Sequence, residues 1–269
     1  MGEVFRRRDL LSLLACAAAA GVARAQSAPP AASAGPPDPK LLDDLVAGNR
    51  ILADQGVVDG FGHISARHDK RPDRFLLARS MAPGLVTLAD IMEFDLDGNP
   101  VDARGRSPYL ERFIHSEIYR ARPDVGSVAH SHAASVIPFG VTKAQLKPIF
   151  HMASFLGAGA PVFEIRDVAG QDSDMLIRSP ELGRALAAKL GKSSVALLRG
   201  HGFVAVGATV KTCVMHAIYT PTNAQAQGEA MRLGPVTYLN PAEAAKISAI
   251  NDGLVDKNWD LWKAHALAR

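Results

Sequence analysis

The sequence predicts an α/β fold built around one sizeable core. Through the middle of the chain, short apolar runs rich in β-branched residues alternate with segments in which apolar residues recur at helical spacing. The chain has 269 residues, of which 48% are hydrophobic and 21% are charged, an ordinary globular composition. Strands that alternate with helices are typical of a layered α/β domain. We therefore expect α/β/α layering in a single domain over residues 40–269.

The first part of this domain combines one helix with three strands. Leucines at helical spacing predict a helix over residues 40–55, which Gly56 ends. Short β-like runs then predict strands at 60–67, 74–79 and 91–96, and an Asp97-Gly98 turn signal closes the last of them.

The second part continues the alternation. A helix is expected to start at Glu111 and to end at Arg122-Pro123, because proline disfavours helix in the residue before it. Ser179 is a predicted N-cap, with Pro180 in the first turn of its helix. The remaining predicted elements are strands at 125–129, 161–165 and 195–199 and helices at 179–190, 210–231 and 241–266.

The N-terminus is predicted to be a targeting signal rather than part of the fold. Arg7-Arg8 precede a short apolar run, and Ala23-Arg24-Ala25 offer the small residues that a signal peptidase needs. We expect residues 1–25 to be a twin-arginine-type signal peptide that directs the chain to the periplasm. Its apolar run is too short for a permanent membrane span. Lipidation at Cys16 is a poorer alternative, because a bulky leucine stands two residues before it.

Composition limits the partners and covalent links of the mature chain. Residues 26–39 are rich in Pro, Ala, Ser and Gly without apolar periodicity, which predicts a disordered linker. Removal of the signal leaves Cys213 as the one cysteine, so no disulfide forms within the mature chain. The net charge is only +3, and aromatic residues are few, so nothing indicates a nucleic-acid-binding face.

Three histidines form a candidate metal site. His130 and His132 end a predicted strand, where side chains two residues apart point to the same side. His201 follows another β-rich run and is flanked by glycines, which let the backbone approach closely. A lone His-x-His is more often an ordinary pair of histidines. Three neutral imidazoles with one open position, however, form a catalytic site for a divalent metal.

The motifs together resemble the class II aldolase/adducin family over about residues 41–228. The resemblance rests on Glu111 placed ahead of RPDVGSVAHSHA, and on GHISAR, MAPGLVTLADIMEFDLDGNPV and LLRGHG. It implies a three-layer α/β/α domain with a central mixed β-sheet, and a homotetramer with its sites near subunit boundaries. It also implies one divalent ion per subunit, with Glu111 as the acid/base. The metal is predicted to be Zn²⁺, Mn²⁺, Fe²⁺ or Co²⁺, because histidine sites accept several ions.

Departures from the sugar-phosphate aldolases indicate a different substrate. Those enzymes hold a phosphate with a Gly-Asn-hydroxyl segment and with serines just before the acid/base glutamate. This chain has His63 in place of the asparagine, and Tyr109 and Leu110 before Glu111. A more apolar entry with an extra imidazole suits an unphosphorylated carboxylic acid. The predicted substrate-binding residues are His63, Arg79, Ser80 and His115.

The preferred prediction is a metal-dependent carbon–carbon lyase of the decarboxylase branch, acting on an aromatic or 2-oxo carboxylic acid. An aldolase for an unphosphorylated hydroxy-carbonyl substrate is the main alternative. Some relatives cleave their substrates oxidatively, which keeps a non-haem iron oxygenase open. A non-catalytic adducin-like module is a further alternative, but such modules have lost the metal ligands that are present here.

Overall fold

The structure is a computed structural model that describes residues 32–268. The predicted signal peptide and the first part of the predicted linker, residues 1–31, lie outside the described residues. Among the residues that are described, no helix is both long enough and apolar enough to cross a membrane.

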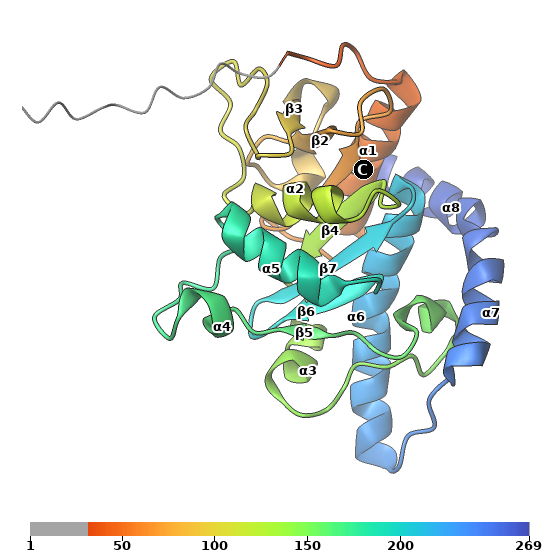
Figure 1. Cartoon of the computed structure of the whole chain (residues 1–269). Helices are drawn as coiled ribbons and strands as arrows, with labels where there is room; N and C mark the ends of the chain where they lie inside the picture. The colour runs from red at the N-terminus through yellow and green to blue at the C-terminus, as the bar shows by residue number, and fades with distance from the viewer. Residues whose placement is uncertain (1–31, 269) are drawn as a thin grey trace, which may run out of the picture.

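A seven-stranded mixed sheet forms the centre of the domain (Figure 1). Its order is β3-β2-β1-β4-β7-β6-β5, and every neighbouring pair is antiparallel except β5 and β6. The strands are β1 (His63–Arg67), β2 (Arg74–Ala78), β3 (Ile91–Asp95), β4 (Ser127–Ser131), β5 (Val162–Phe163), β6 (Val195–Leu198) and β7 (Gly202–Gly207). The central mixed sheet that the family resemblance implied is therefore confirmed.

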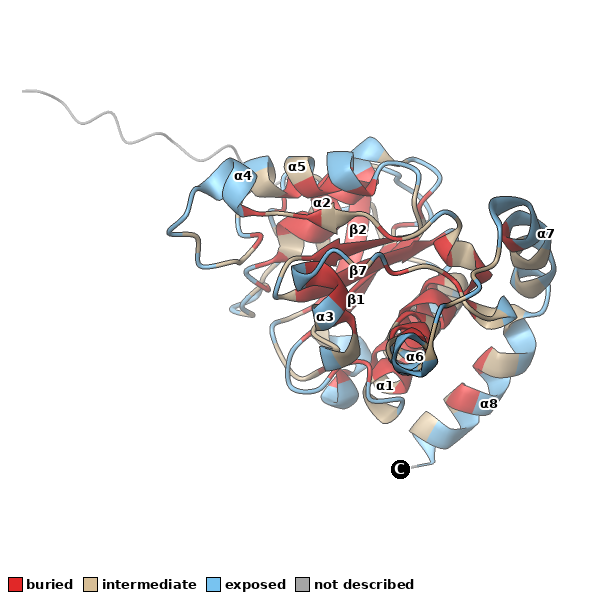
Figure 2. Cartoon of the chain, turned by 90° about the horizontal axis from the view of Figure 1, so that it is seen from below, coloured by how far each residue is buried: buried red, intermediate tan, exposed pale blue. Residues whose placement is uncertain are grey.

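Helices cover both faces of the sheet. Helices α2 and α5 lie on one face, and α1 and α6 lie on the other (Figures 1 and 2). The helices are α1 (Pro39–Asp54), α2 (Arg112–Ala121), α3 (Ile137–Val141), α4 (Arg166–Ala169), α5 (Pro180–Leu190), α6 (Val210–Leu233), α7 (Pro241–Asp252) and α8 (Val255–Leu267). Short 3-10 helices are η1 (Pro83–Leu85), η2 (Leu88–Asp90), η3 (Ala134–Val136) and η4 (His151–Leu156). These layers confirm the predicted α/β/α architecture.

Two hydrophobic clusters hold the layers together, one on each face of the sheet. Along β2, Leu76 packs into the cluster under α1 and α6, whereas Phe75 and Leu77 pack into the cluster under α2 and α5. Successive side chains of a strand point to opposite faces, so a strand that is apolar at every position serves both clusters. This explains why the strands appear in the sequence as continuous apolar runs.

The structure differs from the predicted elements in several places. Residues Gly202–Gly207 form β7, a strand that was not predicted from the sequence. The predicted C-terminal helix is two helices, α7 and α8, separated at Gly253 and Leu254. The strand predicted at 161–165 is reduced to the two residues of β5.

The described end of the predicted linker lies against the domain. The hydroxyl of Ser33 and the backbone N–H of Ala34 donate to the Glu93 carboxylate of β3, at 2.6 and 2.8 Å. His68, on the loop after β1, contacts the carbonyl oxygen of Gly35 at 3.2 Å through Nε2. Composition gave no sign of these contacts, because each depends on a partner at least 33 residues away along the chain.

An ion-pair cluster at the end of β5 gives a testable pH dependence. The hydrogen bond from Arg166, assisted by Arg199, lowers the pKa of Glu164 from 4.5 to about 2. A lowered folded-state pKa stabilises the protein above the unfolded value, and this contribution is lost as the pH falls from about 4.5 to 2. We expect Glu164→Gln to lower the melting temperature at pH 7 and to have a progressively smaller effect between pH 4.5 and 3.

Thermal denaturation of both proteins across this pH range provides the measurement. Glu229→Gln, which removes an exposed carboxylate of α6 outside this cluster, is the matched control. A difference in melting temperature that is the same at pH 7 and pH 3 would show that the Glu164 pairs do not stabilise the fold.

Candidate metal centre

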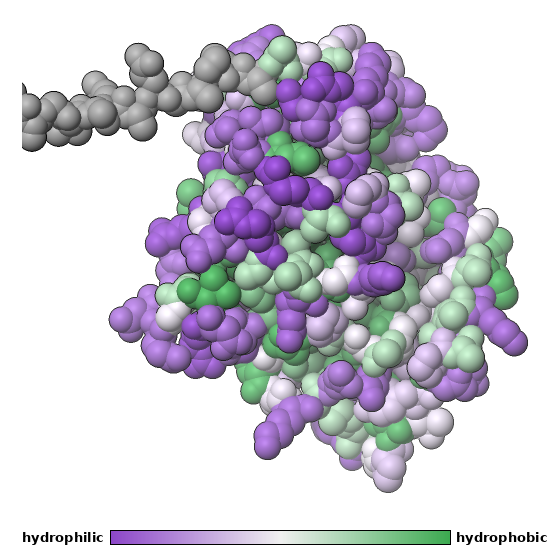
Figure 3. All heavy atoms as spheres, in the orientation of Figure 1, coloured by the Kyte–Doolittle hydropathy of each residue, from purple (hydrophilic) through white to green (hydrophobic). Residues whose placement is uncertain are grey.

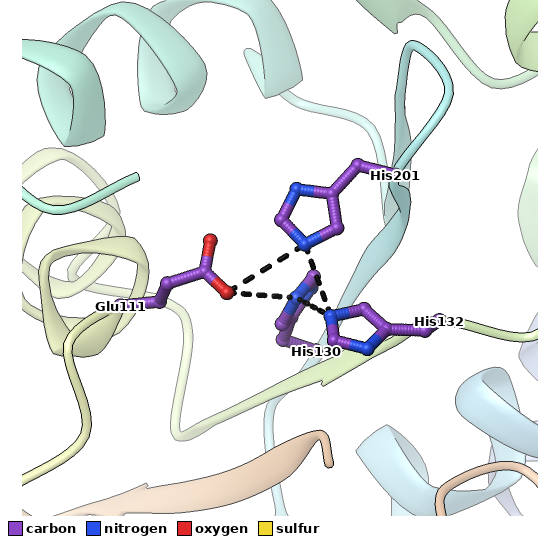
Figure 4. A group of neighbouring side chains, drawn as sticks. All are labelled: Glu111, His130, His132 and His201. Atoms are coloured by element: carbon purple, nitrogen blue, oxygen red, sulfur yellow. Dashed lines mark hydrogen bonds and ion pairs between the residues drawn. The ribbon is translucent and has the colours of Figure 1, made fainter. Parts of the chain in front are cut away.

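Three histidines and one glutamate converge at one end of the central strands (Figure 4). One ligand atom from each side chain lies within 4.8 Å of all the others. We call this set the four-ligand cluster; its members are Glu111, His130, His132 and His201. The predicted three-histidine grouping is therefore present in the structure, and Glu111 joins it.

Strand pairing brings the histidines together. His130 lies within β4, and His132 follows directly after the end of that strand. His201 lies in the tight turn between β6 and β7, where its backbone N–H donates to the carbonyl of Leu198 at 3.0 Å. Because β4 and β7 are adjacent in the sheet, this turn lies beside the end of β4.

Gly202 makes this close approach feasible. A Cβ atom on Gly202 would lie 2.0 Å from the carbonyl oxygen of Ser131 and 3.0 Å from the Cα of His132. No side chain fits there, so only glycine allows the β6–β7 turn to lie against the end of β4. The glycine after His201 is thus part of what places the third histidine.

Glu111 enters the cluster from a different layer. It is the N-cap residue of α2, and its Oε1 accepts the backbone N–H of Ile177 at 2.9 Å. This bond directs Oε2 toward the histidines, at 3.5 Å from Nε2 of His130 and 3.6 Å from Nε2 of His201 (Figure 4).

The hydrogen bonds made by Nδ1 of two of the histidines, the nitrogens outside the cluster, show that the cluster suits a cation. Nδ1 of His130 lies 3.0 Å from the carbonyl oxygen of Phe203, and Nδ1 of His201 lies 2.9 Å from that of Met175. A carbonyl only accepts, so each Nδ1 carries a proton, and in the neutral ring Nε2 presents a lone pair.

The Nε2 lone pairs of His130 and His201 both face the third histidine, His132. Nε2 of His132 lies 3.0 Å from Nε2 of His130 and 3.0 Å from Nε2 of His201. A single N–H on Nε2 of His132 cannot donate fully to both lone pairs. One metal ion, in contrast, can bind all three nitrogens at once. Ligand atoms around a tetrahedral zinc with bonds of about 2.05 Å are ~3.3 Å apart, close to the separations in this cluster.

The charge states also fit a divalent ion. Burial, followed by the charges of His130 and His201, lowers the pKa of His132 to about 4. Burial also lowers the pKa of His201. Burial alone would raise the pKa of Glu111, but contacts with His130, His201 and the Ile177 N–H outweigh it and lower the pKa to about 2. At neutral pH Glu111 is therefore a carboxylate, and His132 and His201 are neutral imidazoles, the forms that bind metal.

A cavity of about 480 Å³ opens onto the cluster. Its lining is mainly apolar, with a few polar groups, which is typical of small-molecule sites. The lining residues are Gly60, Phe61, Gly62, His63, Ser80, Met81, Ala82, Tyr109, Leu110, Glu111, His132 and Leu176.

The structure separates the four predicted substrate-binding residues. His63 and Ser80 line the cavity. Arg79 does not, and its guanidinium donates to Oδ1 of Asp90 at 2.7 Å instead. His115 is fully buried behind His63, with its Nε2 2.6 Å from Nδ1 of His63. Arg79 and His115 therefore do not line this cavity.

Sequence reasoning missed two polar residues that belong to the surroundings of the site. The hydroxyl of Ser65 lies 2.7 Å from both Nδ1 of His115 and the hydroxyl of Tyr119. Helical spacing could have identified Tyr119, because it lies four residues after His115 and eight after Glu111 on one face of α2. Ser65 lies two residues after His63, on the same face of β1.

Comparisons with known proteins agree with the fold. The family profile described as the Class II Aldolase and Adducin N-terminal domain matches residues 43–227. The decarboxylase tropJ of Talaromyces stipitatus is 38% identical over 241 residues, covering 81% of this chain and 91% of that protein. The 3,4-dihydroxyphthalate decarboxylase of a Terrabacter species is 32% identical over 208 residues, covering 72% and 82%.

A solved structure supports the fold. An aldolase II superfamily protein from Pseudomonas syringae superposes with a TM-score of 0.69 at 23% identity, covering 84% of this chain and 92% of that one. Together with the profile match over more than half of the residues, these relatives show that the chain belongs to the class II aldolase and adducin family, among its enzymes.

Proposed function

We propose that this protein is a divalent-metal-dependent carbon–carbon lyase, most specifically a decarboxylase of an unphosphorylated aromatic or 2-oxo carboxylic acid. The observation that carries the proposal is the four-ligand cluster at the end of a mainly apolar cavity. Zn²⁺, Mn²⁺, Fe²⁺ and Co²⁺ all suit a site of three imidazoles and one carboxylate. A bound ion would supply a Lewis acid that stabilises negative charge on the substrate.

The charge of the cavity supports an unphosphorylated substrate. No lysine or arginine is among the described residues that line it. A phosphate dianion usually requires such cations or several hydroxyl and backbone donors. His63, Ser80 and Tyr109 are the polar side chains of the lining away from the cluster. Because the Tyr109 hydroxyl donates to the carbonyl of Met81, His63 and Ser80 are the two left to orient one carboxylate or phenol group.

Glu111 is placed to move a proton during decarboxylation. Its Oε2 faces both the histidines and the cavity. With its low pKa, Glu111 starts as a carboxylate and can accept the proton of a substrate hydroxyl. The C–C bond then breaks, CO₂ leaves, and the electron pair remains on the substrate carbon. Glu111 returns the proton to that carbon, and the ionised substrate oxygen takes up one proton from solvent, so the products are CO₂ and the substrate with hydrogen in place of the carboxylate.

The relatives favour decarboxylation over aldol cleavage. Two of the proteins to which this chain is similar are named as decarboxylases, and one of them is named for an aromatic dicarboxylate. Two apolar side chains of the cavity lining, Phe61 and Leu110, are 70% and 62% exposed. They are therefore free to pack against an aromatic substrate.

Assembly and export complete the proposal. Phe61 and Leu110 would also be covered if subunits met near the site, as in the homotetramer that the family resemblance implies. We further propose that the twin-arginine-type signal carries the protein to the periplasm, where the substrate would be a small extracytoplasmic acid.

Substrate class can be tested by ligand stabilisation. With a fixed content of one Zn²⁺ per subunit, phthalate, 3,4-dihydroxybenzoate and phenylpyruvate are expected to raise the melting temperature. Fuculose 1-phosphate is expected to leave it unchanged, because the cavity offers no cation for the phosphate. A thermal-shift series at equal ligand concentrations measures this. Stabilisation by the sugar phosphate alone would favour an aldolase over the decarboxylase.

Product analysis distinguishes the reaction types. Incubation of the reconstituted protein with 3,4-dihydroxyphthalate should release CO₂ without consumption of O₂ and without formation of an aldehyde. Aldehyde formation would indicate aldol cleavage, and O₂ uptake with Fe²⁺ would indicate an oxygenase.

A further inference from the structure

A buried chain of hydrogen bonds leads from the cavity wall into the layer of α2. Nδ1 of His63 lies 2.6 Å from Nε2 of His115, and Nδ1 of His115 lies 2.7 Å from the hydroxyl of Ser65. That hydroxyl lies 2.7 Å from the hydroxyl of Tyr119. All four side chains are at most 3% exposed, so water does not interrupt the chain.

Tyr119 sets the direction of this chain. Burial raises the pKa of Tyr119, so the phenol keeps its proton and must donate it. Among the described side chains, Ser65 is the acceptor within hydrogen-bond distance. The backbone of Val128 also lies near, but its contact lowers the pKa of Tyr119, so it is an N–H that donates to the phenol oxygen and cannot accept the phenol proton. The opposite direction would leave a buried O–H donor without a side-chain acceptor, which is costly.

The direction of the Tyr119 hydrogen bond fixes where the other three side chains carry their protons. Ser65 has one hydroxyl proton, and since it accepts from Tyr119, it donates to Nδ1 of His115. The neutral His115 ring therefore carries its proton on Nε2 and donates it to Nδ1 of His63. His63 therefore carries its own proton on Nε2. Of its two ring nitrogens, Nδ1 is the one with a hydrogen-bond partner among the described residues.

We infer that the Tyr119–Ser65–His115 chain fixes the tautomer of His63, so that a neutral Nε2–H donor faces the cavity and hydrogen-bonds an anionic oxygen of the substrate. His115, Ser65 and Tyr119 are positioning residues, because none of them lines the cavity. The statement about the substrate depends on the proposed function, whereas the statement about the tautomer does not.

Local packing keeps the ring in this orientation. The His63 ring lies 4.5 Å from the ring of Tyr109, whose hydroxyl donates to the carbonyl of Met81 and so does not compete for His63. A Cβ on the preceding Gly62 would lie 2.6 Å from Val58 and 3.0 Å from the carbonyl oxygen of His130. Glycine at this position lets β1 begin directly beside the cluster.

The inference is tested by observing the proton on His63. The Zn²⁺-loaded protein is labelled with ¹⁵N-histidine, and magic-angle-spinning ¹H–¹⁵N spectra report which ring nitrogen carries hydrogen. The His63 signals are identified by their loss in His63→Gln. We expect the Nε2–H form in the unaltered protein and a mixture of both tautomers in Tyr119→Phe, which removes one hydroxyl and keeps the ring.

A binding measurement accompanies the spectra. If half of the Tyr119→Phe molecules hold the competent tautomer, calorimetry should show about two-fold weaker binding of benzoate, because apparent affinity scales with the competent fraction. Tyr219→Phe, which removes a phenol hydroxyl whose partner is Asn258, is the matched control and should change neither the spectra nor the affinity.

Two results would overturn the inference: a proton on Nδ1 of His63 in the unaltered protein, or an unchanged tautomer in Tyr119→Phe. The tautomer is read without turnover. A protein that showed the expected tautomers but released no CO₂ would contradict the proposed reaction alone.

Discussion

His201→Ala is expected to hold well below one metal ion per subunit and to lose measurable lyase activity. The substitution removes one of the four converging ligands, and it leaves the lone pairs of His130 and His132 without their third neighbour. Loss of a residue that only hydrogen-bonds a metal ligand already lowers metal affinity by roughly 10- to 100-fold, and loss of a histidine ligand itself lowers it further. Metal analysis by mass spectrometry after reconstitution and dialysis measures the occupancy.

The control for this experiment is His265→Ala, which removes an exposed histidine of α8. It should keep full metal content and full activity, whereas His132→Ala should behave like His201→Ala. Full occupancy in the His201→Ala protein would remove this residue from the metal site.

Glu111→Gln is expected to keep the fold and most of the metal, because all three imidazoles remain to hold the ion. It is expected to lose activity by roughly 100-fold or more, the usual scale for a positioned acid/base. The amide keeps the shape of the carboxylate and can still accept the Ile177 N–H. It cannot take up a proton from the substrate or return one to carbon. Turnover per bound metal ion, measured alongside circular dichroism, separates loss of chemistry from loss of metal.

Glu117→Gln offers a matched comparison on the same helix. Glu117 is buried and lies near Arg120 and Arg184, and it is not among the residues that line the cavity. Its replacement should leave turnover per metal ion close to normal. If Glu111→Gln also turned over at a near-normal rate, Glu111 would have a structural role only.

The sequence predicted well those features that depend on neighbours along the chain. The cap at Ser179, the helix that ends at Ala121 before Arg122-Pro123, and the turn at Asp97-Gly98 are all local, and the structure confirms each of them. Strand β4 was also expected, although it lies two residues later than its predicted range. The mixed sheet came from the family resemblance rather than from periodicity.

Features that depend on distant partners were harder to predict. Arg79 was expected at the substrate because a guanidinium suits a carboxylate, but Asp90, eleven residues away, holds it outside the cavity. His115 was expected to touch the substrate, yet it is fully buried against His63, the histidine that lines the cavity. Neither outcome follows from spacing, because each depends on which separate segments of the chain lie side by side in the fold.

An ion bound by the four-ligand cluster would also stabilise the fold by cross-linking distant parts of the chain. Cys213 is free and buried, so no disulfide cross-links the described domain. An ion held jointly by α2, the end of β4 and the β6–β7 turn would close two long loops at once, which restricts the unfolded chain as a cross-link does. At a free concentration of 100 times Kd, such an ion adds ~2.7 kcal/mol to the folded state. Metal supply, rather than thiol oxidation, would then govern how long the protein persists.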